Sequence, residues 1–391
     1  MRFFAWILAA SPVIVALYAY AAYPLVLWLM SRRTQLAPPA PSELPLVTVV
    51  IPAYNEAAQI RGSIEALLAQ DYPAEKRQIL IVSDGSTDGT DDIVAGYAGR
   101  GVELLRLAGR GGKTAAENAA CERVRGEIVV NSDASIRLHP GALSALVANM
   151  ADPSVGVAST RDVSIDSAAG ANATEAGYVG YEMLVRDLET QTGGIVGASG
   201  SGYAIRLALH RHPVRADLSR DFSAALTARL HGYRAVSVHD AVCYVPRTGS
   251  LRAEYRRKVR TIRRGMQTLI ANRRLLNPLR YGFFAVKLFS HKLCRWLVPA
   301  LLVPGAIGLA LLAANERWAR VLLAFSLAGA GVAVIGALWP ADRKLPRLLS
   351  VVTFGAAANL AVVHALVRVL RGGRTDAVWE PTRRPAAPTQ T

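Results

Sequence analysis

Residues 3–30 form an uninterrupted apolar run without a single charged side chain. An α-helix needs about 20 apolar residues to cross a bilayer, and this run is longer. The apolar core of a cleaved signal peptide is shorter, roughly 7–15 residues. Arg32 and Arg33 follow directly, and positive charge favours the cytoplasmic side of a membrane. We therefore predict that residues 1–31 form a transmembrane anchor and that the following chain is cytoplasmic.

The C-terminal part contains further apolar segments, within a predicted membrane region at 296–370. Together with the anchor they predict a multi-pass protein of the cell (inner or plasma) membrane. Three crossings here would place the polar tail, 371–391, outside the cell. Its arginines favour the inside, so we expect one segment not to cross, with 296–314 as first candidate because of Pro299 and Pro304. The segments are 296–314, 318–339 and 348–367.

The chain carries a net charge of +16, with 52% hydrophobic and 19% charged residues. Such a charge can indicate nucleic-acid binding. The basic residues, however, gather beside the apolar segments, above all in a basic amphipathic region at 251–295, where anionic lipid headgroups explain them. No nucleic-acid-binding motif accompanies them. We expect membrane lipids as partners and no nucleic acid.

A stretch of ordinary globular composition, 46–250, follows a Pro-rich linker at 32–45. Short β-branched runs alternate there with segments of helical periodicity, which predicts an open, mostly parallel α/β sheet of Rossmann-like type. The predicted strands are 46–52, 77–86, 101–108, 127–133, 155–159 and 233–239.

Polar residues follow two of these strands. Ala53, Tyr54 and Glu56 stand after the first, where a base or ribose could bind; alternatively, this loop only begins a helix. Asp84 ends the second strand, beside a glycine that allows close backbone approach. Its carboxylate could accept from a ribose hydroxyl or a uracil nitrogen, or could belong to an ordinary turn. Because ligands bind at the carboxyl ends of such strands, we expect a nucleotide-sugar site there.

Lys113 follows two glycines in a segment similar to a phosphate loop. A Walker motif would require glycine at position 107, which is leucine, so the motif is absent. Lys113 remains a candidate contact for phosphate or sugar at the start of a helix.

Asp133 ends the strand at 127–133, and Ser135 stands two residues further on; alternate residues at a strand end point the same way, so both can face one ligand. A carboxylate with a hydroxyl suits Mg²⁺ or Mn²⁺ sharing its coordination with phosphate, although Asp133 could also only cap the strand. Asp221 lies in the first turn of a predicted helix. It is either a general base or a carboxylate favoured by the helix dipole.

These residues, in this order, resemble family 2 glycosyltransferases with a GT-A fold over roughly residues 46–270. The resemblance implies that PAYNE (52–56) forms the nucleotide loop, Asp84 binds the nucleoside, Asp133 holds the cation and Asp221 is the base. The segment around Gly200 is similar to the acceptor-side glycine-rich segment. SHKLCRWLVP (290–299) and VWEPTRR (378–384) resemble the membrane-integrated branch with poly-N-acetylglucosamine and hyaluronan synthases.

Two departures limit the resemblance. The Asp-x-Asp metal motif of many members is Asp133-Ala134-Ser135 here. The Gln-x-x-Arg-Trp box of polymerising members corresponds to 258–262, which lacks the tryptophan that stacks on the acceptor sugar. Residues that could still hold the diphosphate or acceptor are Arg260, Arg263 and Arg264.

The expected activity is inverting transfer of a sugar, first of all from a UDP-sugar, to a lipid-linked or membrane-proximal glycan. A divalent cation, Mg²⁺ or Mn²⁺, is expected as cofactor. Two alternatives remain open: a processive exopolysaccharide synthase that exports its polymer, and a non-catalytic transporter or scaffold with a degenerate nucleotide-binding domain.

Overall fold

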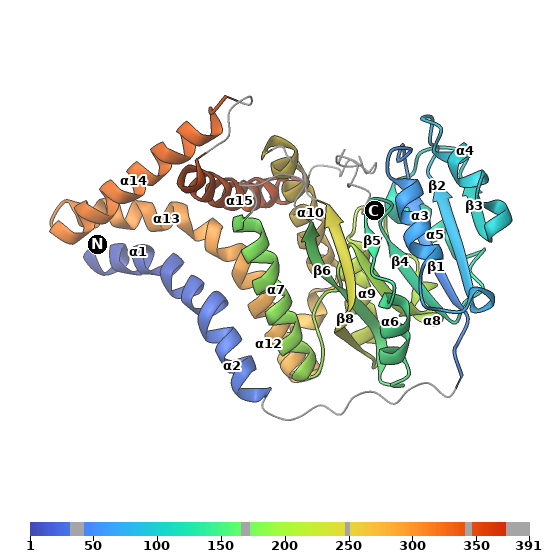
Figure 1. The fold of residues 1–391 in the computed structure, drawn as a ribbon. Helices are drawn as coiled ribbons and strands as arrows, with labels where there is room; N and C mark the ends of the chain where they lie inside the picture. The colour runs from blue at the N-terminus through green and yellow to red at the C-terminus, as the bar shows by residue number, and fades with distance from the viewer. Residues whose placement is uncertain (32–42, 166–172, 247–250, 341–345, 373–391) are drawn as a thin grey trace.

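The computed structural model describes residues 1–31, 43–165, 173–246, 251–340 and 346–372. An eight-stranded sheet occupies one side of this described part, and long helices occupy the other (Figure 1). The strands follow the order β3-β2-β1-β4-β7-β6-β8-β5 across the sheet. They are β1 (Val47–Ala53), β2 (Arg77–Ser83), β3 (Val102–Arg106), β4 (Ile128–Ser132), β5 (Arg137–Leu138), β6 (Val155–Ile165), β7 (Gly202–Arg206) and β8 (Arg234–Pro246).

The first half of the sheet is parallel, as predicted. β1 pairs with β2 and β4, and β2 pairs with β3. Every residue of β1 is buried because helices cover both of its faces, which explains why this strand is apolar on both sides. The carboxyl ends of β1, β2 and β4 therefore meet at one edge, with the predicted polar residues following them.

The second half of the sheet is mixed. β7 runs antiparallel to both β4 and β6, whereas β8 runs parallel to β6 and antiparallel to β5. β6 and β8 extend past the predicted segments to Ile165 and Pro246. β5 and β7 were not predicted as strands, because neither contains a long apolar run. The α/β prediction is confirmed, with a more complex topology than expected.

Helices cover the two faces of the sheet. On one face, Ile64 and Leu146 pack with Val49 and Ile51 of β1. On the other, smaller side chains such as Ala120 join Val50 of β1. The first face carries α3 (Ile60–Leu68), α4 (Thr90–Ala95) and α6 (Ala142–Met150); the second carries α5 (Lys113–Ala120), α8 (Leu207–His210) and α9 (Arg220–Leu230). Short 3-10 turns lie at Ala74–Lys76, Ala98–Arg100 and Arg273–Leu276.

Four helices in the described residues are long and apolar enough to cross a membrane: Arg2–Met30, Phe283–Ala313, Arg317–Ala337 and Leu349–Leu370. Large apolar side chains on them face outward; Phe325, for example, is 72% exposed, as a lipid-facing residue would be. The second span begins well before the predicted 296–314 and continues as a helix through Pro299 and Pro304. The number of crossings and the side of the tail stay predictions. The elements are α1 (Arg2–Leu17), η1 (Tyr18–Ala22), α2 (Tyr23–Met30), α12 (Phe283–Leu288), η5 (Phe289–Cys294), α13 (Arg295–Ala313), α14 (Arg317–Ala337) and α15 (Arg347–Leu370).

Some predicted segments cannot be placed. Most of the linker (32–42), the tail from 373 onward and its VWEPTRR sequence lie outside the described residues.

Small residues let α1 and α13 pack closely. A Cβ on Gly308 would lie 2.6 Å from the backbone nitrogen of Ala9, and one on Gly305 would lie 2.7 Å from Cγ of Pro12. Such small-residue contacts are typical of helix pairs in membranes. Both spans also contain a π-helical turn, η1 and η5, and these turns meet where the hydroxyls of Tyr18 and Ser290 lie 2.7 Å apart.

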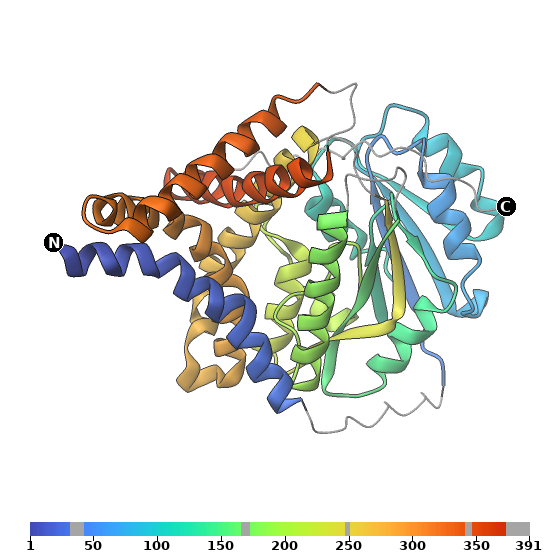
Figure 2. The same ribbon diagram turned by 60° about the vertical axis from the view of Figure 1, so that its left-hand side comes forward.

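Helix α7 (Ala173–Gln191), which the sequence did not predict, lies between the sheet and the membrane helices (Figure 1, Figure 2). Its carboxylates pair with the second span: His291 lies 2.8 Å from Glu182 and 2.7 Å from Glu189, and Arg295 donates to Glu182 at 2.6 Å. Tyr23 of α2 donates to Glu189 at 2.5 Å. On the other side, the predicted amphipathic helix is α10 (Leu251–Ala271), which packs along α15; α11 (Pro278–Tyr281) follows it.

Replacing Gly126 with alanine should destabilise the sheet. The added Cβ would lie 2.4 Å from the backbone nitrogen of Thr48 and 2.8 Å from the carbonyl oxygen of Leu46, neither of which can yield freely. We expect a loss of about 1–3 kcal/mol, seen as a lower melting temperature of the purified chain in detergent. Gly99→Ala is the control, because no atom lies within 4 Å of its added Cβ. Equal melting temperatures for the two variants would contradict this packing.

Candidate active site

A cavity of about 330 Å³ lies beside the ends of β1 and β4. It brings together most of the predicted site residues, which come from six separate stretches of the chain. Ala53, Tyr54, Asp84 and Arg263 do not line it. The predicted residues in its lining are Glu56, Lys113, Asp133, Ser135, Gly200, Asp221, Arg260 and Arg264.

The loop after β1 is held against the loop after β2. Asn55 adopts a φ of 53°, a left-handed conformation that asparagine tolerates better than most residues. Its side-chain oxygen accepts from the backbone N–H of Thr87 at 2.9 Å. The next N–H, that of Glu56, donates to the hydroxyl of Thr90 at 2.9 Å. These bonds turn the chain so that the buried Glu56 reaches the cavity.

Ala53 and Tyr54 support this loop from outside the cavity. The carbonyl of Ala53 accepts from the N–H of Asp84 at 2.8 Å. The guanidinium of Arg110 lies 3.9 Å from the centre of the Tyr54 ring, a cation–π contact. The Tyr54 ring, which was a candidate stacking surface for a nucleobase, is therefore in contact with the guanidinium of Arg110.

Asp84 organises the glycine loop that precedes Lys113. Its side chain is buried at the end of β2, and its two oxygens accept from the N–H groups of Gly111 and Gly112, both at 2.7 Å. Hydrogen bonds to a charged acceptor are among the stronger ones in proteins. Gly112 has a φ of 87°, which favours glycine, and it caps α5. Asp84 thus fixes the position of Lys113.

Lys113 and Asp133 form the central ion pair of the cavity. The ammonium of Lys113 lies 2.5 Å from Oδ1 of Asp133 and donates to the carbonyl of Gly200 at 3.2 Å. Burial alone would lower the pKa of Lys113, but the carboxylates of Asp133 and Glu117 raise it above its usual value. The lysine therefore stays charged. The expected phosphate contact and the expected cation ligand are neighbours in space.

Asp133 and Ser135 offer oxygen ligands for a cation. Both line the cavity, as the prediction required. Among the described residues no group of three or more His, Cys, Asp or Glu side chains could hold a metal. One carboxylate with one hydroxyl fits a cation that takes its remaining ligands from a bound diphosphate. Because Lys113 contacts Oδ1 of Asp133, such a cation could bind Oδ2 of the same carboxylate.

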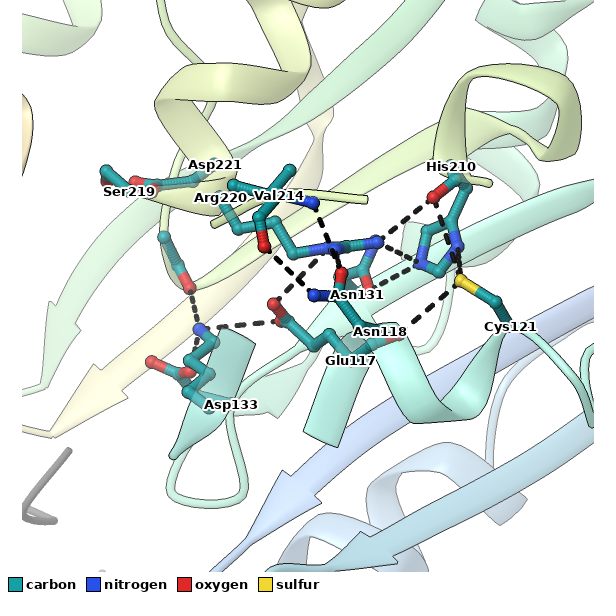
Figure 3. Close-up of polar contacts among 12 residues, drawn as sticks. Glu117, Asn118, Cys121, Asn131, Asp133, His210, Val214, Ser219, Arg220 and Asp221 are labelled. Carbon is teal, nitrogen blue, oxygen red and sulfur yellow. Dashed lines mark hydrogen bonds and ion pairs between the residues drawn. The ribbon is translucent and has the colours of Figure 1, made fainter. Parts of the chain in front are cut away.

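A network of polar contacts connects Asp133 at one end to His210 and Cys121 at the other, as Figure 3 shows. Glu117 is fully buried; its oxygens lie 4.0 Å from Nζ of Lys113 and 3.5 Å from Nε of Arg220. Arg220 also donates to the side chain of Asn118 and, at 3.1 Å, to the carbonyl of His210. Burial raises the pKa of Glu117, and the two cations oppose that effect. One signal in the sequence could have identified Glu117: it stands four residues after Lys113, on the same face of the helix.

His210 completes the network as a neutral group. Its ring lies 3.3 Å from Sγ of Cys121 and 3.2 Å from the side-chain oxygen of Asn131. Burial first, and then the neighbouring Arg220, lower the pKa of His210 to about 3. The imidazole is therefore uncharged at neutral pH and adds no third cation beside Glu117.

Asp221 faces the cavity from the first turn of α9, directly after Arg220. The hydroxyl of Ser219, the residue before the helix, donates to its Oδ1. A Cβ on Gly200 would lie 3.2 Å from its Oδ2, so only glycine leaves this carboxylate unobstructed. The position suits a base that meets a substrate held beside Gly200.

The arginines of α10 divide between two faces of that helix. Arg257, Arg260 and Arg264 line the cavity because residues three, four and seven positions apart share a face. Arg263 is buried and turns elsewhere, so it does not line the cavity as predicted for a diphosphate contact. Arg257 was not predicted. Burial lowers the pKa of Arg264, and the Asp221 carboxylate opposes this shift.

Asp162 is a further residue that the sequence did not reveal. Its carboxylate accepts from the hydroxyls of Ser199 at 2.6 Å and Ser201 at 3.3 Å, and so holds the loop that contains Gly200. Burial raises its pKa, an effect that the Ser199 hydrogen bond and Arg186 oppose. The predicted strand ended at residue 159, three positions too early to place Asp162 at the site.

Asp84→Asn should loosen the glycine loop. An amide retains one acceptor oxygen but turns an N–H₂ group toward one of the backbone donors at 2.7 Å. We expect a loss of about 1–3 kcal/mol in unfolding free energy, measured by denaturant titration in detergent. Asp92→Asn, an exposed carboxylate on the neighbouring α4, is the control and should change little. A normal midpoint for Asp84→Asn would argue against these bonds.

Comparisons with known proteins agree with this geometry. Residues 48–204 match a family described as Glycosyl transferase family 2, and residues 128–335, more than half of the chain, match Glycosyl transferase family group 2. Glycosyltransferase AglE of Haloferax volcanii is 37% identical over 100 residues, which is 25% of this chain and 33% of that protein. An N-acetylglucosaminyltransferase of Mesorhizobium japonicum is 35% identical over 125 residues, 31% of this chain and 29% of that protein. These matches span about a third of each curated relative.

Among solved structures, the mannosyltransferase PcManGT from Pyrobaculum calidifontis, in complex with GDP-Man and Mn²⁺, superposes with a TM-score of 0.75. The match covers 95% of this chain and 99% of that chain at 24% identity, so it demonstrates a shared fold. The GT-A-like sheet with its flanking apolar helices is thus a known architecture. On the family match and this fold, the chain belongs to the family 2 glycosyltransferases.

Proposed function

We propose that this enzyme transfers a sugar, with inversion, from a nucleotide sugar to a hydroxyl of a lipid-linked or membrane-proximal acceptor. The observation that carries the proposal is the position of Asp221. It lines the cavity of Lys113 and Asp133, and it also lines a second cavity bounded by candidate membrane helices. A base at this junction can meet a donor from one side and an acceptor from the other. Family membership favours this enzyme over a non-catalytic scaffold.

The donor belongs in the first cavity. Asp84 and the loop from Ala53 to Glu56 would bind the nucleoside, directly or through the glycine loop that Asp84 holds. Lys113, Arg260 and Arg264 surround the space for a diphosphate with positive charge. The complex of PcManGT with GDP-Man supports a nucleotide-sugar donor. A UDP-sugar remains the first candidate, and GDP-mannose follows.

A divalent cation, Mg²⁺ or Mn²⁺, is proposed on the same cavity wall. Asp133 and Ser135 would hold it, sharing it with the diphosphate. When bound, such a cation neutralises charge on a leaving diphosphate. The Mn²⁺ in the PcManGT complex supports this proposal.

The proposed reaction is an in-line displacement. Asp221 accepts the proton of the acceptor hydroxyl while the hydroxyl oxygen forms a bond to the anomeric carbon. The bond from that carbon to the diphosphate breaks, and the nucleoside diphosphate leaves with the electron pair. Lys113, Arg260 and Arg264 stabilise the charge that develops on it. Arg220, held by Glu117, keeps the adjacent Asp221 in place.

Membrane attachment fits the acceptor side. We propose that the helices reside in the cell (inner or plasma) membrane with the sheet in the cytoplasm, where nucleotide sugars are made. Four candidate spans in the described residues support a membrane location. We favour addition of a single sugar over polymer synthesis because Ile262 stands where polymerising relatives carry the tryptophan.

Asp221→Asn should abolish most turnover, because an amide cannot accept the proton. We expect kcat to fall about 10²–10⁴-fold, with little change in KM for the donor. The measurement is release of nucleoside diphosphate by the purified chain in lipid, after a screen of nucleotide sugars. Asp217→Asn is the control: Asp217 pairs with Arg215 and lines neither cavity. Undiminished turnover in Asp221→Asn would remove its role as base.

Removal of divalent cations should stop the same reaction. In excess EDTA we expect loss of turnover, and recovery after addition of Mg²⁺ or Mn²⁺. Ser135→Ala should raise the Mg²⁺ concentration needed for half-maximal activity, because it removes one oxygen ligand. Full activity in EDTA would instead mean that Lys113 and the arginines neutralise the charge of the diphosphate without a cation.

A further inference from the structure

The second cavity, of about 600 Å³, lies between α9, α10, α13 and α15. It shares Ser219, Asp221, Arg257 and Thr261 with the first cavity, so the two meet at the proposed base. The proposed function places the acceptor on this side, and the lining of the larger cavity indicates what kind of acceptor would fit.

Its outer wall is apolar and comes from candidate membrane spans. Pro299 of α13 and Phe354, Ala358 and Val362 of α15 face the cavity, opposite Ile262 of α10. A molecule bound against this wall would bury apolar surface on the side of the cavity formed by the candidate membrane helices. The occupant therefore has an apolar part that reaches the membrane.

Its inner wall is positively charged. Arg257, Lys258, Lys292 and Arg295 line it, against the carboxylates of Asp221 and Glu182. Arg295 pairs with Glu182 at 2.6 Å, and Lys258 lies 3.5 Å from Glu254 outside the lining. An ionisable group placed on a candidate membrane helix in this way indicates function.

Lys292 has a looser environment than these cations. Its ammonium lies 5.5 Å from the ring centre of Phe222, the residue after Asp221, and it interacts with the carboxylates of Glu182 and Glu189 through longer-range electrostatics. Lysine on an apolar helix requires an anion or water for its charge. An anionic group bound to Lys292 would therefore lie close to Asp221, the proposed base.

Trp296 lies one helical turn after Lys292 and lines the same cavity. A Cβ on Gly265 would lie 3.2 Å from its Cζ2, so the glycine of α10 lets this indole reach the cavity. The indole of Trp296 on α13 and the side chain of Ile262 on α10 thus both line the second cavity, and Trp296 is the aromatic one of the two.

We propose that the second cavity binds the phosphate-bearing headgroup of a membrane lipid. Lys292 contacts the phosphate, Trp296 packs against the apolar part of the lipid next to the phosphate, and the tail follows the wall of α13 and α15 toward the bilayer. Basic pockets between membrane helices bind anionic headgroups in this manner. The inference rests on the proposed function and narrows its acceptor to an acidic lipid whose hydroxyl reaches Asp221.

The test is calorimetric titration of the full-length chain in maltoside detergent with dihexanoyl phosphatidic acid. Dihexanoylglycerol, with the same tails and no phosphate, and inorganic phosphate, without tails, are titrated in parallel. We expect both to bind at least about tenfold more weakly than the phosphatidic acid. Equal binding of dihexanoylglycerol would overturn the phosphate contact, and equal binding of inorganic phosphate would overturn the lipid.

Variants assign the binding to this cavity. Lys292→Gln should weaken it about tenfold, and Lys292→Arg should restore it to within about threefold, because a charged hydrogen bond is lost and then replaced. Ala358→Trp should block it by filling the space while keeping every charge. Arg320→Gln, an exposed cation on α14 outside both cavities, should leave it unchanged. Normal affinity in Lys292→Gln, or an equal loss in Arg320→Gln, would assign the binding to the outer surface of the helices.

Donor turnover separates this inference from the proposed function. If lipid binding depends on Lys292 but the chain releases no nucleoside diphosphate from any nucleotide sugar, the proposed function fails and the lipid site stands. If the chain transfers sugar while Lys292→Gln binds the phosphatidic acid normally, the proposed function stands and the lipid site fails.

Discussion

The arrangement of both cavities depends on one buried hydrogen-bonded contact, in which His291 lies between Glu182 and Glu189 of α7. Burial alone would raise the pKa of each carboxyl, but His291 and the neighbouring cations hold both below the usual value. Arg295 forms an ion pair with Glu182 in the same cluster, and removing one partner of a buried ion pair costs about 3–5 kcal/mol. The cluster therefore fixes α7, which lies beside the sheet, against the candidate membrane helices, and Asp221 lies between the two cavities.

The first half of the sheet and the residues at its edge could be predicted from sequence because the information is local. Buried parallel strands are continuous β-branched runs, and the polar residues that follow them in sequence also follow them in space. The antiparallel β7 and helix α7 could not be predicted, since their places depend on partners far away in the chain. For the same reason Glu117, Arg220 and Asp162 escaped notice: each acts through a contact between distant segments. Arg263 is buried outside the lining of the first cavity, although it follows Arg260 by three residues, and its predicted diphosphate contact stays a prediction.

Some of the positive charge gathers around the two cavities. Lys113, Arg260 and Arg264 surround the first cavity, while Lys258, Lys292 and Arg295 surround the second. Arg257 of α10 belongs to both. Part of the net charge of +16 therefore belongs to side chains that line the two cavities.

The π-helical turn η5 explains how one helix serves both the membrane and the active site. Such a turn holds one residue more than an α-helical turn, so it rotates the face presented by everything beyond it relative to everything before it. In η5 and directly after it stand His291, Lys292, Arg295 and Trp296, all turned toward the second cavity. A single-residue insertion in an ordinary membrane helix would produce this rotation at once. A homologue with one residue fewer here would therefore present a different helical face to the second cavity.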